Sequence, residues 1–124
     1  MSVSCPCCSN LAYHNCCEPF HTNKAVPTTP EATMRSRYAA YALHLIDYLV
    51  ETTHPETRNL HHKKDIESWA KQNVWLSLEI ISPQDNKVEF KAHYQNGSKK
   101  YTHHEKSTFK IENKRWYYLR GEYF

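Results

Sequence analysis

Residues 87–97 read KVEFKAHYQNG, and this stretch decides the fold class of the chain. Apolar and polar side chains alternate along it, which is the pattern of a strand with one buried face. The apolar set is Val88, Phe90, Ala92 and Tyr94. The stretch ends in Asn96-Gly97, the dipeptide most typical of a tight β-hairpin turn. The sequence therefore predicts an antiparallel strand pair that meets at this turn.

Further strands are expected on both sides of the hairpin. Before it, alternate apolar residues share one face of a strand: Leu76, Leu78 and Ile80. Residues 82–86 (SPQDN) then predict a turn. After the hairpin the pattern predicts a strand over about residues 100–112, a turn at Asn113–Lys114 and an aromatic-rich strand at Arg115–Leu119. Together these segments make an antiparallel meander over residues 73–124.

Residues 28–72, which precede the strands, carry helical patterns. Thr29, Pro30 and Glu31 predict a helix start, because they offer a capping hydroxyl, a proline suited to the first helical position and a negative charge near the helix N-terminus. Apolar residues then recur at helical spacing: Met34, Tyr38, Tyr41, Leu45 and Leu49. Helices followed by a meander predict an α+β fold, in which a curved antiparallel sheet packs on N-terminal helices and leaves a cavity between them.

The helical zone is expected to divide into three helices. We predict a break near His44–Asp47, with Asp47 capping a second short helix that ends before Pro55. A third helix over about residues 63–72 has one face made of Ile66, Trp69 and Ala70.

The composition narrows the function classes. A chain of 124 residues with 40% hydrophobic and 23% charged residues has the size and composition of one globular domain. Its 2 glycines are too few for a glycine-rich phosphate-binding loop. No apolar run reaches the ~18 residues of a membrane span, and the N-terminus lacks the pattern of a secretory signal. We therefore expect a cytoplasmic protein without membrane association, and a formal charge of +3 is too small to argue nucleic-acid binding.

All the cysteines of the chain fall in its first 17 residues: Cys5, Cys7, Cys8, Cys16 and Cys17. The odd count and the two adjacent pairs argue against a disulfide framework, because a disulfide between neighbours is strained. In a reducing compartment metal binding is the main use of such a cluster, and a redox or free-thiol cluster is the alternative.

The cysteine spacing predicts a structural zinc site. Zinc takes four thiolate or imidazole ligands in a tetrahedron, and the spacing supplies three of them as Cys5, Cys7 and Cys16. The fourth is Cys17 or His21, of which Cys17 is favoured, so that Cys8 is a spare thiol. A closed site of this type leaves no position for water, which favours a recognition element over a catalytic centre.

The chain is expected to consist of two parts, a zinc-binding segment and a domain with its own core. Residues 1–27, the N-terminal knuckle, are too few to form a core by burial, so zinc would supply much of their folding energy. Residues 28–124, the cone, contain every predicted long helix and strand and are expected to fold by themselves.

Residues 5–17, CPCCSNLAYHNCC, resemble the SEC-C motif, a zinc-binding element found at the end of the SecA preprotein translocase motor. The motif reads Cys-x-Cys-x-Ser-Gly-Lys-x-Tyr-x-x-Cys followed by Cys or His, and the chain matches it at Cys5, Cys7, Ser9, Tyr13, Cys16 and Cys17. It departs at Cys8 and Asn10, where glycine is usual, and at Leu11, where lysine is usual. Asparagine tolerates the positive φ of a glycine, whereas Leu11 removes a basic contact and weakens any inference of an acidic partner.

A second resemblance covers nearly the whole chain. Six segments are similar to the YchJ-type proteins, an uncharacterised bacterial family: EPFH (18–21), MRSRYAAY (34–41), DYLVETTHPETR (47–58), WLSLEI (75–80), HEKSTF (104–109) and RWYYLRGE (115–122). The resemblance implies a SEC-C zinc knuckle followed by a nuclear-transport-factor-2-like cone. It implies no activity.

A second candidate site lies in the expected cavity of the cone. The third predicted strand places Glu105 and Ser107 on the same face as Phe109 and Ile111, so that all four point inward if the last two enter the core. A buried carboxylate needs a partner. The pocket candidates are therefore Glu105 and Ser107 from the strand with Arg35, Arg37 and Tyr41 from the first helix. An ion pair that ties the sheet to the helix is favoured over a small-molecule pocket.

Three functions remain open at this point. The favoured one is a protein-interaction module that binds a partner through the zinc knuckle. The first alternative is a small-molecule binder or acid–base enzyme that uses Glu105 with a helix arginine, although no nucleophile–base pair stands at a required spacing. The second is RNA or ribosome contact through two clusters that mix charge with aromatic rings, Lys99–Tyr101 and Lys114–Tyr117.

Histidine pairs add a weaker metal hypothesis. His61-His62 and His103-His104 could each bind a second metal, but pairs of this kind are more typical of solvated residues.

Overall fold

The computed structural model describes residues 3–124 as an α+β fold in which the helices come first and the strands last. The helical elements are the 3-10 turn η1 (Tyr13–Asn15) and the α-helices α1 (Glu18–His21), α2 (Pro30–Leu43), α3 (Ile46–Glu51), α4 (Pro55–Arg58) and α5 (Lys63–Gln72). The strands are β1 (Val74–Gln84), β2 (Lys87–Asn96), β3 (Lys99–Glu112) and β4 (Arg115–Tyr123). They form one antiparallel sheet in the order β1-β2-β3-β4, which confirms the predicted meander.

The predicted hairpin joins β2 to β3. Asn96 pairs with Lys99, and Gly97 between them has φ 63°. Such a conformation costs little only in glycine, so the sequence signal and the backbone agree. The turn after β1 is shorter than predicted, because β1 continues to Gln84 and only Asp85 and Asn86 separate the strands. The last strand is longer than predicted and ends at Tyr123.

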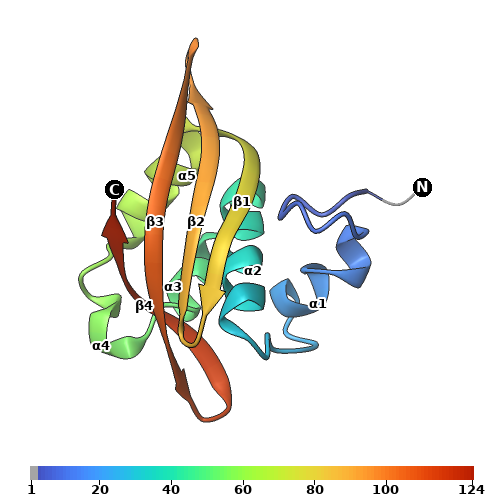
Figure 1. Cartoon of the computed structure of the whole chain (residues 1–124), viewed down its shortest axis with the longest axis vertical. Coiled ribbons are helices and arrows are strands. Elements are labelled where there is room, and N and C mark those ends of the chain that lie inside the picture. The colour runs from blue at the N-terminus through green and yellow to red at the C-terminus, as the bar shows by residue number, and fades with distance from the viewer. Residues whose placement is uncertain (1–2) are drawn as a thin grey trace.

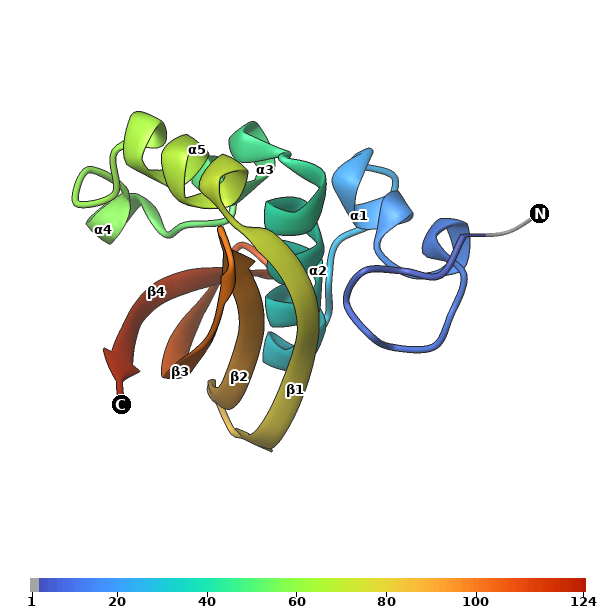
Figure 2. The ribbon, with the colours of Figure 1, turned by 90° about the horizontal axis from the view of Figure 1, so that it is seen from above.

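Curvature of the sheet comes from register shifts. Shifts occur in β1 between Trp75 and Ser77 and between Ile80 and Ser82, and in β4 between Tyr118 and Arg120, opposite Thr108 and Phe109 of β3. An extra residue in one strand bends that strand and increases its twist. Figure 2 shows the result, a sheet whose strands arch beside α2 with α3 and α5 above them.

Two hydrophobic clusters form the core between sheet and helices. The first unites α2 with all four strands: Met34, Tyr38, Leu78, Val88, Phe90, Ala92, Phe109 and Tyr118. The second joins α2, α3 and α5: Ala40, Ile46, Tyr48, Leu49, Ile66 and Ala70. Because α2 contributes to both clusters, it is the element on which the rest of the cone is assembled.

Helix α2 begins as the sequence predicts. The Thr29 hydroxyl accepts a hydrogen bond from the amide of Ala32 at 3.0 Å. The helix ends at His44, whose left-handed φ of 59° makes the predicted break. Asp47 does not cap α3, because the turn at His44 lets that helix begin at Ile46 and leaves Asp47 in its first turn.

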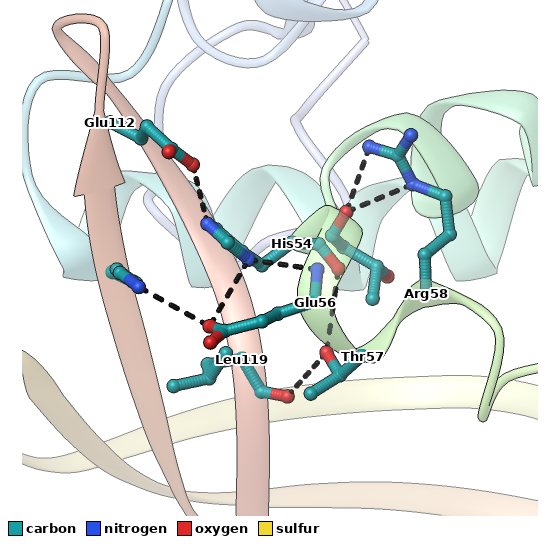
Figure 3. Close-up of polar contacts among 8 residues, drawn as sticks. His54, Glu56, Thr57, Arg58, Glu112 and Leu119 are labelled. Atoms are coloured by element: carbon teal, nitrogen blue, oxygen red, sulfur yellow. Dashed lines mark hydrogen bonds and ion pairs between the residues drawn. The ribbon is translucent and has the colours of Figure 1, made fainter.

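A polar network fixes the segment between α3 and α4 to the edge of the sheet (Figure 3). The amide of His54 donates to the carbonyl of Tyr118 at 2.8 Å, and the His54 ring bonds Glu112 through Nε2. Arg58 donates back to the carbonyl of Thr53 at 2.9 Å. His54 is thus an N-terminal cap of α4, where its Nδ1 accepts from the amide of Glu56.

The knuckle lies on the opposite side of α2 from the sheet (Figure 1). It also reaches the edge strand, where the amide of Leu78 lies 3.4 Å from the Cys8 sulfur. None of the helices in the described residues combines the length and the apolar character that a membrane-spanning segment needs.

Candidate functional site

The chain brings four cysteine sulfurs together in the knuckle. The Sγ atoms of Cys5, Cys7, Cys16 and Cys17 all lie within 4.8 Å of one another. The Cys7–Cys16 and Cys16–Cys17 separations are 3.5 and 3.8 Å. Sulfurs at the corners of a zinc tetrahedron with Zn–S bonds of 2.3 Å are about 3.8 Å apart. The donor set therefore fits a four-coordinate soft metal.

The cluster is held by short local turns. Cys8 and Asn10 have positive φ values of 65° and 69°, so they stand where the motif uses glycine for a conformational reason. The Ser9 hydroxyl lies 3.1 Å from the Cys16 sulfur. Cys5, Cys7 and Cys17 are buried, whereas Cys8 is exposed and lies outside the four-sulfur group.

The thiols of the cluster influence one another strongly. A hydrogen bond from Cys17 lowers the pKa of Cys7 to about 4, and burial raises the pKa of Cys5 to about 11. The pKa of Cys17 is raised, first because it donates to Cys7 and then because it is buried. Without a metal, Cys7 is thus a thiolate beside the neutral thiols of Cys5 and Cys17. A bound cation is what allows four thiolates to share so small a volume.

His21, the alternative fourth ligand, is used elsewhere. Its Nε2 lies 2.8 Å from the carbonyl of Ser36, and its Nδ1 lies 2.7 Å from the hydroxyl of Tyr13. A carbonyl only accepts, so Nε2 carries the proton and Nδ1 accepts from Tyr13. Burial lowers the pKa of His21, in keeping with a neutral ring. His21 therefore joins the knuckle to α2, and Cys17 completes the sulfur group.

Arg35 also belongs to the junction between knuckle and cone. Its Nη1 donates to the carbonyl of Cys7 at 2.7 Å, and its Nε pairs with Glu31 at 3.0 Å. The expectation that Arg35 lines the cone pocket is wrong. Residues 35 and 37 are two positions apart on α2 and point to opposite sides of the helix, one toward the knuckle and the other toward the sheet.

The cone contains a partly open pocket of about 290 Å³. It lies between α2, α5 and the inner face of the sheet, and its lining is rich in aromatic side chains: Tyr38, Tyr41, Trp69, Trp75, Phe90, Tyr118 and Tyr123. Arg37, Glu105 and Ser107 line it as the sequence predicts. Ile111 is 53% exposed, because it lies near the end of the strand, so only Phe109 of that pair enters the core.

The partners of Glu105 differ from the expected arginine. His103 contacts its Oε1 at 2.7 Å, and Ser107 and Tyr118 donate to its Oε2 at 2.5 and 3.0 Å. Burial opposes ionisation, but these donors outweigh it and hold the pKa of Glu105 below its ordinary value. No ion pair joins Glu105 to an arginine within the described residues, so the favoured sheet-to-helix ion pair is not formed.

Arg37 is instead anchored by neutral acceptors. Its Nη1 donates to the carbonyl of Leu49 at 3.0 Å and to the hydroxyls of Thr52 and Thr53 at 2.7 and 3.3 Å. Its guanidinium lies 4.6 Å from the ring centre of Tyr118. Two of these anchoring residues lie against β4: the Thr52 carbonyl accepts from the amide of Tyr118, and Thr53 forms a β-bridge with Tyr118.

Several pocket residues were not predicted as such. Strand alternation places His103 in the pocket and His104 on the other face, where His104 contacts Glu89 at 2.7 Å, so this pair cannot share a metal. The same alternation could have identified His103 from the sequence. The parts played by Tyr118 and Thr53 depend on which strand and loop lie side by side, for which the sequence has no local signal.

Comparison with known proteins places this architecture in a family. Residues 29–121 match the family described as YchJ, middle NTF2-like domain. The chain belongs to the YchJ family. The matched residues begin at residue 29, just beyond the knuckle, and end two residues before the end of β4.

The similarity to relatives also covers the knuckle. A UPF0225 protein of Actinobacillus succinogenes is 42% identical over 96% of this chain and 81% of its own length. A UPF0225 protein of Pectobacterium carotovorum is 37% identical over 98% of this chain and 84% of its own length.

Solved structures show the same arrangement. The solution structure of a SEC-C motif containing protein from Rhodopseudomonas palustris matches with a TM-score of 0.88 and 39% identity, over 97% of this chain and 98% of that one. The crystal structure of a SEC-C motif containing protein from Psychrobacter arcticus matches with a TM-score of 0.84 and 36% identity, over 94% and 80%. Both support the prediction of a SEC-C knuckle on an NTF2-like cone.

Proposed function

We propose that this protein binds a small molecule in its cone and holds a structural zinc ion in its knuckle. The observation that carries the binding role is the aromatic pocket of about 290 Å³ with ionisable side chains fixed in its wall. Concave, mostly apolar pockets with a few convergent polar groups are the usual form of ligand sites. The proposal replaces protein recognition, which the sequence favoured, as the leading function.

The state of Glu105 favours binding over acid catalysis. A carboxylate whose pKa is lowered and which already accepts from three donors keeps its charge and has no proton to give. Its hydrogen bonds fix the pocket wall instead.

Zinc is proposed for the knuckle because the four sulfurs have the spacing of a zinc tetrahedron and both solved relatives are SEC-C motif proteins. Four protein ligands leave no open position, so the metal has a structural part and takes no part in the pocket.

The pocket can be tested by filling it. Ala92 lines the cavity on β2, and its neighbour Lys91 points to the other face of the sheet. A ligand found by a thermal-shift screen of small molecules should no longer stabilise Ala92→Leu but should still stabilise Lys91→Leu. Equal stabilisation of both variants would contradict binding in the cone.

Protein recognition by the knuckle remains a second proposal. Leu11, at the position where the motif usually has lysine, is 53% exposed, and Val3 is 74% exposed. A partner that binds through the knuckle should be captured by the wild type and by Ala92→Leu but not by Leu11→Lys. Capture by all three proteins would argue against the knuckle as the contact.

Nucleic-acid binding is not part of the proposal. The basic clusters Lys99–Tyr101 and Lys114–Tyr117 lie on successive hairpins of the meander and therefore at opposite ends of the sheet (Figure 1). They do not form one continuous basic surface.

A further inference from the structure

We propose that the pocket takes an aromatic or alicyclic monocarboxylate, whose carboxylate group pairs with Arg37. The inference rests on the proposed ligand-binding function and names the chemical class of the ligand. It follows from the hydrogen-bond partners of the two charged pocket residues, Arg37 and Glu105.

Arg37 is a buried cation without an anionic partner. Its side chain is 5% exposed, and all the hydrogen bonds it donates within the described residues go to uncharged oxygens. Those bonds all leave from Nη1, so the N–H groups of Nε and Nη2 have no acceptor among residues 3–124, and neither nitrogen is fully enclosed by the protein. A buried charge is costly unless it is paired, and these two nitrogens belong to a side chain that lines the cavity.

The guanidinium is held in one orientation. Three acceptors fix Nη1, and the Tyr118 ring lies 4.6 Å from the guanidinium carbon. The edge formed by Nε and Nη2 is the one that a carboxylate binds through two parallel hydrogen bonds. Because the edge is already oriented, a ligand would lose little free energy in ordering it.

Glu105, unlike Arg37, has hydrogen-bond partners for all of its charged group. Both of its oxygens already accept hydrogen bonds from His103, Ser107 and Tyr118. It therefore offers a ligand cation little direct contact, but its negative charge disfavours a second anionic group in the same cavity. Burial, and then the charge of Arg37, lower the pKa of His61 in the pocket wall, so His61 supplies no second positive charge. The pocket consequently fits one carboxylate and not two.

The remainder of the ligand must be apolar and compact. The side chains of Trp69, Trp75 and Phe90 line the cavity together with Tyr38. A volume of about 290 Å³ is roughly twice that of a cavity of about 150 Å³ that binds benzene. A single ring with a short carboxylate-bearing arm fits this space.

The test compares acids with their uncharged amides on the full-length, metal-loaded protein. Calorimetry and ligand-observed NMR would be used with benzoate, phenylacetate, cyclohexanecarboxylate and indole-3-acetate, with the four corresponding amides and with benzyltrimethylammonium. We expect at least one acid to bind about tenfold or more tightly than its amide, a difference of about 1.4 kcal/mol.

Two variants separate charge from shape. Arg37→Lys keeps the charge but loses the paired donors, and it should weaken the acid about tenfold or more while leaving the amide unchanged. Glu105→Gln removes the like charge, and it should strengthen the acid and leave the amide unchanged. If Arg37→Lys does not fold, the acid-to-amide ratio of the wild type and the Glu105→Gln response decide the question.

The outcomes distinguish the two proposals. Equal binding of acids and amides, or preference for benzyltrimethylammonium, would overturn the carboxylate inference while the ligand-binding function stands. If probes bind but Ala92→Leu weakens the binding of none of them, the probes bind outside the cone. If no probe of either charge binds at millimolar concentration, both the inference and the proposed function are wrong.

Discussion

Gly121 on β4 shows how closely the pocket wall is built. A Cβ atom at this position would lie 2.1 Å from Oε2 of Glu105, so the strand and the carboxylate leave no room for a methyl group. We expect Gly121→Ala to displace Glu105 from Ser107 and Tyr118 and to lower the free energy of unfolding by roughly 1–3 kcal/mol. Urea unfolding measures the loss.

A double-mutant cycle supplies the control for Gly121. In the Glu105→Ala background the added methyl group has space, so Gly121→Ala should cost much less there. Equal costs in the two backgrounds would mean that strand β4, and not the carboxylate, resists the methyl group.

The lowered pKa of Glu105 predicts how the stability of the protein depends on pH. Its pKa is lower in the folded protein than the ordinary value of 4.5, so its ionised form contributes stability above pH 4.5, and this contribution is lost as the pH falls through the folded pKa. Glu105→Gln has no such contribution. The difference in urea midpoint between wild type and Glu105→Gln should therefore shrink between pH 6 and pH 3. A constant difference would contradict the assignment.

At the scale of elements, α2 is shared by two sites. Its knuckle side carries Arg35 and Ser36, and its sheet side carries Arg37 and Tyr41. We expect Arg35→Ala to loosen the knuckle without affecting zinc, because it removes the hydrogen bond to the Cys7 carbonyl but no ligand. Hydrogen exchange in residues 3–27 should accelerate about tenfold or more, since a charged hydrogen bond contributes about 1.5–3 kcal/mol.

Arg120→Ala is the matched control for this element. Arg120 is exposed on β4, across the sheet from the knuckle, so its removal should leave exchange in the knuckle unchanged. Acceleration by both variants would indicate a global loss of stability and contradict a local role for Arg35.

The same helix shows what the sequence could and could not predict. The periodicities of Met34 and Tyr38 in α2 and of Val88 and Phe90 in β2 reflect local geometry, so helices, strands and hairpin are confirmed. That Arg37 and not Arg35 meets the sheet depends on which helix face the strands cover. Because α2 has buried residues on two sides, its apolar residues do not mark which side faces the sheet, and the helix is only weakly amphipathic.

The contacts of the pocket residues were likewise predictable only where they depend on local geometry. Strand alternation was enough to bring Glu105 and Ser107 to one face with His103. The Tyr118 hydroxyl on Glu105 and the threonine hydroxyls on Arg37 come from segments that meet only in the folded chain. The four-sulfur group could be predicted, because all four cysteines lie within 13 consecutive residues and no distant segment contributes to it.

At the scale of the whole molecule, the knuckle and the cone differ in what holds them together. The cone has two hydrophobic clusters, whereas the buried cluster of the knuckle consists of Cys5, Cys7 and Cys17 with Ala39 of α2. Removal of zinc by a chelator should therefore unfold residues 3–27 and leave the cone folded. The predicted boundary between residues 27 and 28 would appear in hydrogen exchange as the limit of the affected region.

Substitution of single cysteines tests the metal directly. Native mass spectrometry of the wild type should show one zinc ion per chain, and Cys16→Ser should weaken zinc binding by more than about 100-fold, because loss of a ligand exceeds the 10–100-fold effect of losing a residue that supports one. Cys8→Ser is the matched control and should retain the metal, since Cys8 lies outside the cluster. Equal loss in both variants, or a wild type without zinc, would contradict the four-cysteine site.

The indole pair in the pocket gives the molecule an optical reporter of its own. The rings of Trp69 and Trp75 lie 5.8 Å apart at 72°, edge to face, and both line the cavity, whereas Trp116 lies outside it. Two indoles at this separation couple their electronic transitions, and the coupled circular-dichroism band depends on the angle between the rings. A guest that enters the cavity and turns either ring changes this band, so occupancy can be followed on unlabelled protein by light alone.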